Sequence, residues 1–171
     1  YEEKPELADD EWMEKLESLK EMDFPFYQCS WIGGEPLLRK ELIDRGMKYF
    51  KSNLVATNGT IELPHWPDVN FYISVDGKKE MHDAIRGKPE TFSNLCKTIE
   101  RLFTLREQYP NLRLRVHSVV TPQNVGEIKA TIDFFHKKYQ LDEHSLEIVR
   151  DLSMLGAHHD SPERQAIADQ Y

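Results

Sequence analysis

The motif Gly33-Gly34-Glu35-Pro36 combines residue types that suit the binding of a small polar ligand. It closes the apolar run 24–32 and opens a helix-like segment. Two glycines let a ligand approach the backbone closely, and proline at a first helical position loses only an N–H that has no helical partner. Helix N-terminal amides attract anions, but Glu35 places a carboxylate there. The motif therefore favours an ammonium group, although it also suits a plain strand-to-helix turn with an acidic first helical turn.

A second candidate lies in the alternating segment 71–76. Side chains of a strand alternate between two faces, which groups Tyr72, Ser74 and Asp76 opposite the apolar residues. If the apolar face packs on helices, Ser74 and Asp76 point toward the mouth of the fold. A hydroxyl and a carboxylate there can bind the two hydroxyls of a sugar. Asp76-Gly77 is also a common turn, so this segment alone does not decide the function.

Further candidates follow in the chain. Arg86 is able to form a bidentate pair with a carboxylate, although a solvated surface arginine is the plainer interpretation. The adjacent pair His82-Asp83 is a weak signal for metal, because a metal site needs additional spaced ligands. The same reasoning applies to His158-His159-Asp160, which we interpret as a mobile loop.

The elements that position these residues alternate between helix and strand. Apolar residues at helical spacing predict a first helix near 12–22 and later helices over 37–50, 92–103 and 125–135. Predicted strands cover 26–32, 54–57, 71–75, 112–120 and 146–149, and prolines make 61–68 a loop or broken turn. A loop and a terminal helix are expected over 153–171. We count five strands, interleaved with four helical segments, of which the broken turn at 61–68 is one, and preceded by a fifth.

Such alternation implies parallel strands with right-handed crossovers. The expected folds are an α/β barrel, an incomplete barrel or a doubly wound sheet. In all three, ligands bind at the carboxyl ends of the strands, where Gly33, Asn58, Asp76 and Thr121 fall.

Composition narrows the class of partner. The chain has 171 residues and a formal net charge of -8, which argues against non-specific binding to nucleic acid or anionic lipid. No apolar run approaches the roughly 20 residues that cross a bilayer, so we expect no membrane association and a cytoplasmic location. The two cysteines, Cys29 and Cys96, are too far apart for a short metal-ligand motif, and we expect both to be buried structural residues.

Taken in order, three motifs resemble the core of a radical S-adenosylmethionine (SAM) enzyme, particularly the peptide-modifying branch that often carries a C-terminal auxiliary-cluster domain. They are Gly33-Gly34-Glu35-Pro36, Thr57-Asn58-Gly59-Thr60, and Ile73-Ser74-Val75-Asp76-Gly77 followed by His82-Asp83, Arg86 and Thr91-Phe92. The resemblance covers about 27–150. It implies one domain over 1–171, a partial (β/α)6 TIM-like barrel of parallel strands that lacks its first strand.

The resemblance also implies the ligand contacts. Gly33, Gly34, Glu35 and Pro36 would meet the methionine amino group of SAM, and Ser74 and Asp76 would lie near its ribose. Arg86 is a weaker candidate for the methionine carboxylate, and Asn58 for lining the pocket. The implied partners are a peptide or small-molecule substrate and a reductant protein such as flavodoxin or ferredoxin.

The chemistry of that family needs a [4Fe–4S] cluster on the motif Cys-x3-Cys-x2-Cys, because three thiolates hold the cluster and leave one iron for SAM. Reduction then cleaves SAM to a 5′-deoxyadenosyl radical, which abstracts hydrogen from the substrate. This chain lacks the motif. We therefore expect a fragment truncated before the cluster loop, inactive by itself.

Two other classes of function stay open. One is a non-catalytic barrel scaffold that binds a protein partner. The other is a cluster-free α/β-barrel lyase or isomerase that uses Asp76, His117 or Arg115, of which the last two share one face of their predicted strand.

Overall fold

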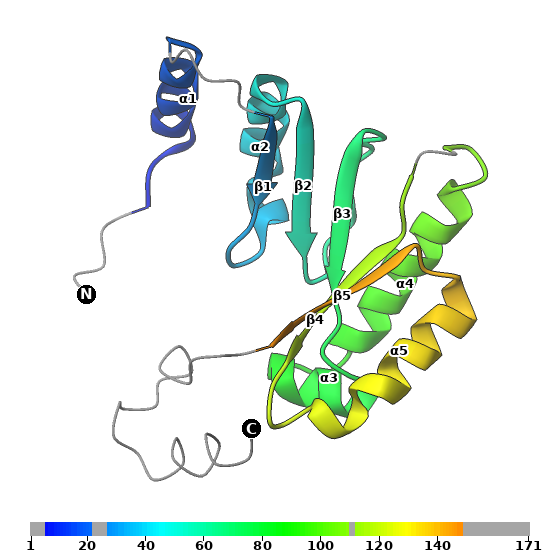
Figure 1. Ribbon diagram of the computed structural model, residues 1–171. Helices are drawn as coiled ribbons and strands as arrows, with labels where there is room; N and C mark the ends of the chain where they lie inside the picture. Colours follow the sequence, from blue (N-terminus) through cyan, green and yellow to red (C-terminus); the bar gives the residue numbers. More distant parts are fainter. Residues whose placement is uncertain (1–5, 22–26, 110–111, 149–171) are drawn as a thin grey trace, which may run out of the picture.

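The computed structural model describes residues 6–21, 27–109 and 112–148 and contains one parallel five-stranded sheet (Figure 1). Its strands pair in chain order, each parallel to the next. They are β1 (Gln28–Trp31), β2 (Ser52–Thr57), β3 (Val69–Ser74), β4 (Arg115–Val120) and β5 (Glu143–Ile148). The α/β class is confirmed. Within the described residues the sheet has five strands, whereas a complete (β/α)6 barrel has six.

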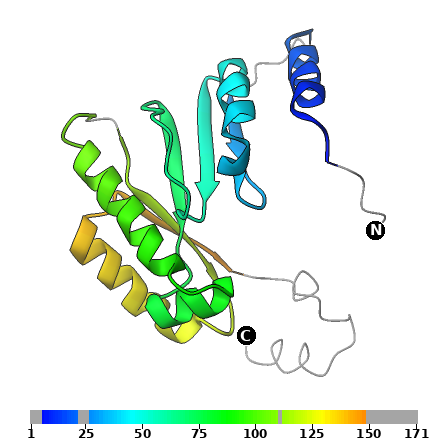
Figure 2. The same ribbon diagram turned by 180° about the vertical axis from the view of Figure 1, so that it is seen from behind.

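Five α-helices accompany the sheet in the described ranges: α1 (Asp9–Ser18), α2 (Lys40–Gly46), α3 (Lys79–Arg86), α4 (Thr91–Leu105) and α5 (Val125–Tyr139). Three of them, α2, α4 and α5, cover the same face of the sheet, as the views from front and back show (Figures 1 and 2). Helix α3 lies at the end of the sheet, beside the connection from β4 to α5. The chain thus forms a sheet whose strands follow one another in one direction, with these three helices on one face.

The buried face of the sheet forms the core. Burial alternates along β2 and β3, so Val55, Phe71 and Ile73 face inward at 2% exposure or less. Leu95 of α4 and Phe135 of α5 pack against them, both with no exposed surface. The predicted alternation of the β3 segment is therefore confirmed. It places Tyr72 and Ser74, both half-buried, on the opposite face, which we call the open face.

Several predicted boundaries were wrong. The helix expected over 37–50 is three short pieces: 3-10 turns Pro36–Arg39 and Met47–Tyr49 flank α2. Arg39 has φ −118° and ψ 42°, outside the helical region, so the helix restarts after it. Helix α3 was not predicted, although Gly87 ends it at φ +65°, as glycine commonly ends helices.

Strand β5 begins three residues earlier than predicted, and β4 begins at Arg115 and not at 112. Of the extra residues of β5, Glu143 and Ser145 face the open side, where burial does not select apolar side chains. His144 faces the helix-covered side, where its Nε2 lies 2.8 Å from the buried Ser118 hydroxyl. The expected terminal helix and the motif His158-His159-Asp160 lie outside the described residues.

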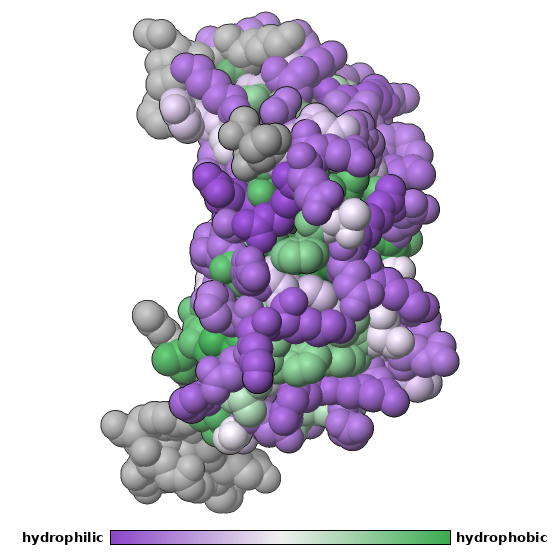
Figure 3. Space-filling model, turned by 90° about the vertical axis from the view of Figure 1, so that its right-hand side faces the viewer, coloured by the Kyte–Doolittle hydropathy of each residue, from purple (hydrophilic) through white to green (hydrophobic). Residues whose placement is uncertain are grey.

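The outer surface is largely polar. The side of the molecule that carries α4 and α5 is mostly hydrophilic, with apolar side chains showing between the polar ones (Figure 3). None of the helices in the described ranges combines the length and hydropathy that crossing a bilayer requires.

Candidate functional site

The Gly-Gly turn follows β1 and needs its glycines for backbone conformation. Gly33 has φ +96° and Gly34 has φ +51°, values that residues with a side chain rarely adopt. A Cβ atom added at either position would meet nothing within 4 Å. The space beside both glycines is therefore open, and a ligand can approach the backbone there.

The carboxylate of Glu35 ties this turn to the neighbouring strand. Its Oε1 accepts hydrogen bonds from the backbone N–H of Leu37 at 3.1 Å and from the Thr57 hydroxyl at 2.8 Å. Its Oε2 accepts one from the backbone N–H of Asn58 at 2.8 Å. Glu35 is thus the N-cap of the turn at Pro36, and it also joins the ends of β1 and β2. Most of the acceptor positions of this carboxylate are therefore occupied by hydrogen bonds within the chain.

Three predicted site residues lie at the carboxyl edge of the sheet. Thr57 of β2 pairs in register with Ile73 of β3, so Asn58 and Ser74 follow on adjacent strands. Neighbouring strands lie about 4.8 Å apart. The side-chain oxygen of Asn58 accepts from the N–H and the hydroxyl of Thr60, at 2.9 and 2.6 Å, which fixes the turn after β2. Glu35, Asn58 and Ser74 therefore form a row along the carboxyl edge.

Asp76 is held from three directions just beyond β3. Its Oδ2 forms an ion pair with Nη2 of Arg86 at 2.6 Å. Its backbone N–H donates to Nδ1 of His82 at 3.2 Å, and its carbonyl oxygen accepts from Nδ2 of Asn124 at 2.9 Å. The residue is only 5% exposed. Arg86 thus occupies one carboxylate oxygen of Asp76, and little of the side chain is exposed, whereas the expectation that Asp76 points toward the mouth stays a prediction.

Asp83, the neighbour of His82, has a structural role at the start of α4. Its Oδ1 accepts from the Thr91 hydroxyl at 2.6 Å and from the backbone N–H of Phe92 at 2.8 Å. These bonds favour the charged form, the Thr91 bond most, and lower the pKa of Asp83. His82 and Asp83 are consequently engaged with different partners.

The two cysteines do not form a metal site. Cys29 lies on β1 and Cys96 on α4, and both are half-buried, less than the full burial that we expected. Burial raises the pKa of Cys29 to about 11 and also raises that of Cys96, so the thiolate that binds iron is disfavoured at both. Within the described ranges no group of three His, Cys, Asp or Glu side chains is arranged to hold a metal ion. An iron–sulfur cluster does not fit these residues.

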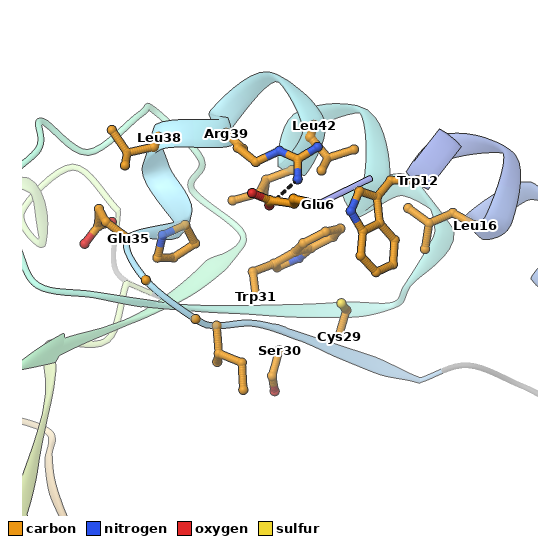
Figure 4. Close-up of a pocket in the computed structure, with 15 residues that line it drawn as sticks. Glu6, Trp12, Leu16, Cys29, Ser30, Trp31, Glu35, Leu38, Arg39 and Leu42 are labelled. Atoms are coloured by element: carbon orange, nitrogen blue, oxygen red, sulfur yellow. Dashed lines mark hydrogen bonds and ion pairs between the residues drawn. The ribbon is translucent and has the colours of Figure 1, made fainter. Parts of the chain in front are cut away.

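An apolar cleft of about 580 Å³ lies between α1 and the edge strand β1 (Figure 4). Trp12 and Trp31 line its centre, and the Gly-Gly turn with Glu35 and Pro36 forms one end, where the Glu35 carboxylate points away from the tryptophans. Arg39 holds α1 in place, because its guanidinium binds Glu6, Asp9 and the carbonyl of Leu7. Sequence reasoning missed this cleft. Its lining does not include Asn58, Ser74, Asp76 or Arg86.

Arg115 and His117 lie on the open face and have acidic neighbours. Nε of Arg115 binds Glu143 at 3.1 Å, and the Tyr72 hydroxyl donates to the same carboxylate at 2.9 Å. Nδ1 of His117 lies 2.9 Å from the Ser145 hydroxyl. The Arg115 guanidinium is thus paired with an acidic side chain of the neighbouring strand.

No protein-family model matches this chain, and no curated protein matches it at a significant level.

Proposed function

We propose that this chain is the SAM-binding core of a radical SAM enzyme. The observation that carries the proposal is the row of Glu35, Asn58 and Ser74 along one edge, beside two glycines with open space over their backbone. The order of these residues in the sequence is the order that the family resemblance requires.

The architecture supports a partial barrel. The strands are parallel and sequential, and helices α2, α4 and α5 cover one face (Figures 1 and 2). In a doubly wound sheet, helices would lie on both faces. In a barrel, all helices lie outside, and the inward face carries the residues that line the mouth. The open face would then be the inner face, with Ser74 near its carboxyl end.

The ammonium group and the ribose diol of SAM each have a partner of suitable chemistry in this proposal. A carboxylate offers about four acceptor positions, and three of those on Glu35 are used by Leu37, Thr57 and Asn58. The remaining position, on Oε2, accepts the methionine ammonium group. Ser74 contributes its hydroxyl to the ribose diol, together with Oδ1 of Asp76, which has no hydrogen-bond partner among the described residues. Pairing with Arg86 neutralises Asp76, which suits an uncharged diol.

In this proposal the methionine carboxylate is a second partner of Arg86. Arginine carries five N–H donors, and the ion pair with Asp76 engages Nη2. Asn58 lines the pocket between the amino group and the ribose.

The remaining parts of the proposal lie beyond these residues. In the intact enzyme, one electron from a reduced [4Fe–4S] cluster would cleave SAM to methionine and a 5′-deoxyadenosyl radical. That radical would remove hydrogen from a peptide or small-molecule substrate. Because Cys29 and Cys96 do not fit a cluster, we place the [4Fe–4S] ligands outside this chain. A reductant such as flavodoxin or ferredoxin and a cytoplasmic setting complete the proposal.

Calorimetric titration of the chain with SAM tests the binding step. Ser74→Ala removes one hydrogen bond and should weaken binding about tenfold, the equivalent of about 1.4 kcal/mol. Ser93→Ala, an exposed serine of α4, is the matched control and should bind like the wild type.

A ligand that lacks the ribose hydroxyls sharpens the test. If Ser74 contacts the diol, its substitution should have no further effect on the affinity for 2′,3′-dideoxy-SAM. Equal losses for both ligands, or no SAM binding by the wild type, would contradict the proposal.

A further inference from the structure

His82 is a fully buried imidazole at the edge where the proposed ligand binds. It lies on α3 with no exposed surface, and Phe92 of α4 packs against its ring at a centroid distance of 5.9 Å. Buried polar groups usually have a hydrogen-bond partner. Its Nδ1 accepts the backbone N–H of Asp76, whereas its Nε2 has no partner among the described residues.

This contact fixes the protonation state of the ring. Because Nδ1 accepts a hydrogen bond, the single proton of the neutral imidazole sits on Nε2. A second proton on Nδ1 would face the N–H of Asp76, so two donors would meet. The bond is therefore possible only while His82 is neutral.

The surroundings keep the ring neutral near pH 7. Burial is the largest influence and lowers the pKa of His82, and the positive charge of Arg86 acts in the same direction. The negative charges of Asp76 and Asp83 oppose this, but they are outweighed. Phe92, on the packed helix, carries no charge.

The three partners of Asp76 together form a clamp, defined by His82, Arg86 and Asn124. His82 and Arg86 are one helical turn apart on α3, so a single helix holds both the backbone and the carboxylate. Asn124 reaches from the start of α5 and also binds the carbonyl of Val119 at 2.9 Å. The end of β3 is thus fixed relative to two helices.

We propose that His82 is a positioning residue for this site: its neutral imidazole fixes the backbone of Asp76 and so places the carboxylate for the ligand's diol. The site loses affinity when the ring takes up a proton, because the backbone contact is then broken. This inference rests on the proposed function, of which it explains one feature, the placement of Asp76.

Two substitutions separate this role from simple burial. His82→Asn retains an oxygen acceptor near the Nδ1 position and cannot be protonated. His82→Leu has a similar volume and no acceptor, which leaves the Asp76 N–H unpaired. His65→Asn changes an exposed histidine that contacts Tyr109 and serves as control.

The first measurement is the SAM dissociation constant at pH 7 and pH 5. The wild type and His65→Asn should bind more weakly at pH 5 than at pH 7, because a larger fraction of His82 is protonated at pH 5. His82→Asn should bind within about threefold of the wild type at pH 7 and lose this pH dependence. His82→Leu should bind about tenfold more weakly at pH 7.

The second measurement is the hydrogen exchange rate of the Asp76 amide by NMR, which needs no ligand. The amide should be protected in the wild type and in His82→Asn and should exchange faster in His82→Leu. Wild-type affinity for His82→Leu, or an unchanged pH dependence in His82→Asn, would overturn the positioning role. Absence of SAM binding by the wild type would instead refute the proposed function, and the exchange rates would then decide alone whether His82 holds Asp76.

Discussion

Substitution of Glu35 by alanine should destabilise the whole chain, because this carboxylate joins the ends of β1 and β2. The change removes the acceptor for Leu37 N–H, for the Thr57 hydroxyl and for Asn58 N–H. Thr57 is only 1% exposed, so water cannot easily replace the lost partner of its hydroxyl.

The magnitude follows from the three bonds. Loss of the N-cap costs about 1 kcal/mol of the free energy of unfolding. The other two bonds, both to a charged acceptor, contribute about 1 kcal/mol each at this half-buried position. The expected loss is about 3 kcal/mol, which lowers the melting temperature of a domain of this size by about 6–12 °C.

Thermal unfolding followed by circular dichroism measures this effect. Glu41→Ala is the matched control, since Glu41 lies on α2 with 71% of its side chain exposed and a contact of only 3.9 Å to Lys40. It should change the free energy of unfolding by less than about 0.5 kcal/mol. Glu35→Gln keeps Oε1 but sets an amide group against Asn58 N–H, and should fall between the two. Equal melting temperatures for Glu35→Ala and Glu41→Ala would refute the structural role of Glu35.

Three further outcomes are expected. Gly33→Ala should lower the free energy of unfolding by about 1–2 kcal/mol because φ is +96° there. Gly126→Ala, in α5 with nothing near its Cβ position, should instead raise it by about 0.5–1 kcal/mol. Chemical denaturation compares the two variants, and similar effects would contradict the assigned backbone strain at Gly33. Because the pKa of Asp83 is lowered in the folded chain, its contribution to the free energy of unfolding is complete above its ordinary pKa of 3.8 and is lost as pH falls through the pKa of the folded state. The free energy of unfolding measured between pH 5 and pH 2 should therefore fall less steeply in Asp83→Asn than in the wild type. Parallel curves would argue against the hydrogen bonds of Asp83. Burial, and secondarily His117, lowers the pKa of His144 from 6.5 to about 4. As pH falls, the unfolded chain therefore takes up a proton at His144 before the folded chain does, so the free energy of unfolding should decline from pH 6.5 toward pH 4. A decline of equal slope in His144→Asn would count against this buried environment of His144.

The fold class was predictable because burial leaves a periodic signal. Alternating apolar residues in the β3 segment indicated a half-covered strand, and the structure shows Phe71 and Ile73 buried with Ser74 on the other face. The Gly-Gly-Glu-Pro motif likewise indicated a turn between a strand and a helical segment, and the structure has such a turn, in which both glycines have positive φ. Such features depend on neighbours close in sequence.

The missed features depend on contacts between distant residues. Nothing near Glu35 in the sequence indicates that Thr57 and Asn58 donate to its carboxylate. The ion pair of Asp76 with Arg86 was equally hidden, since each residue alone suited a ligand. The cleft beside β1 arises only when α1 packs near Trp31, and no local pattern reveals it.

The most direct test of the central claim is an NMR titration of the isotopically labelled chain with SAM. We expect saturable chemical-shift changes at the amides of Gly33, Gly34, Asn58, Ser74 and Asp76, with 2′,3′-dideoxy-SAM perturbing the last two less. Saturation without changes at these amides, or changes confined to the cleft between α1 and β1, would contradict a SAM site at the carboxyl edge of the sheet.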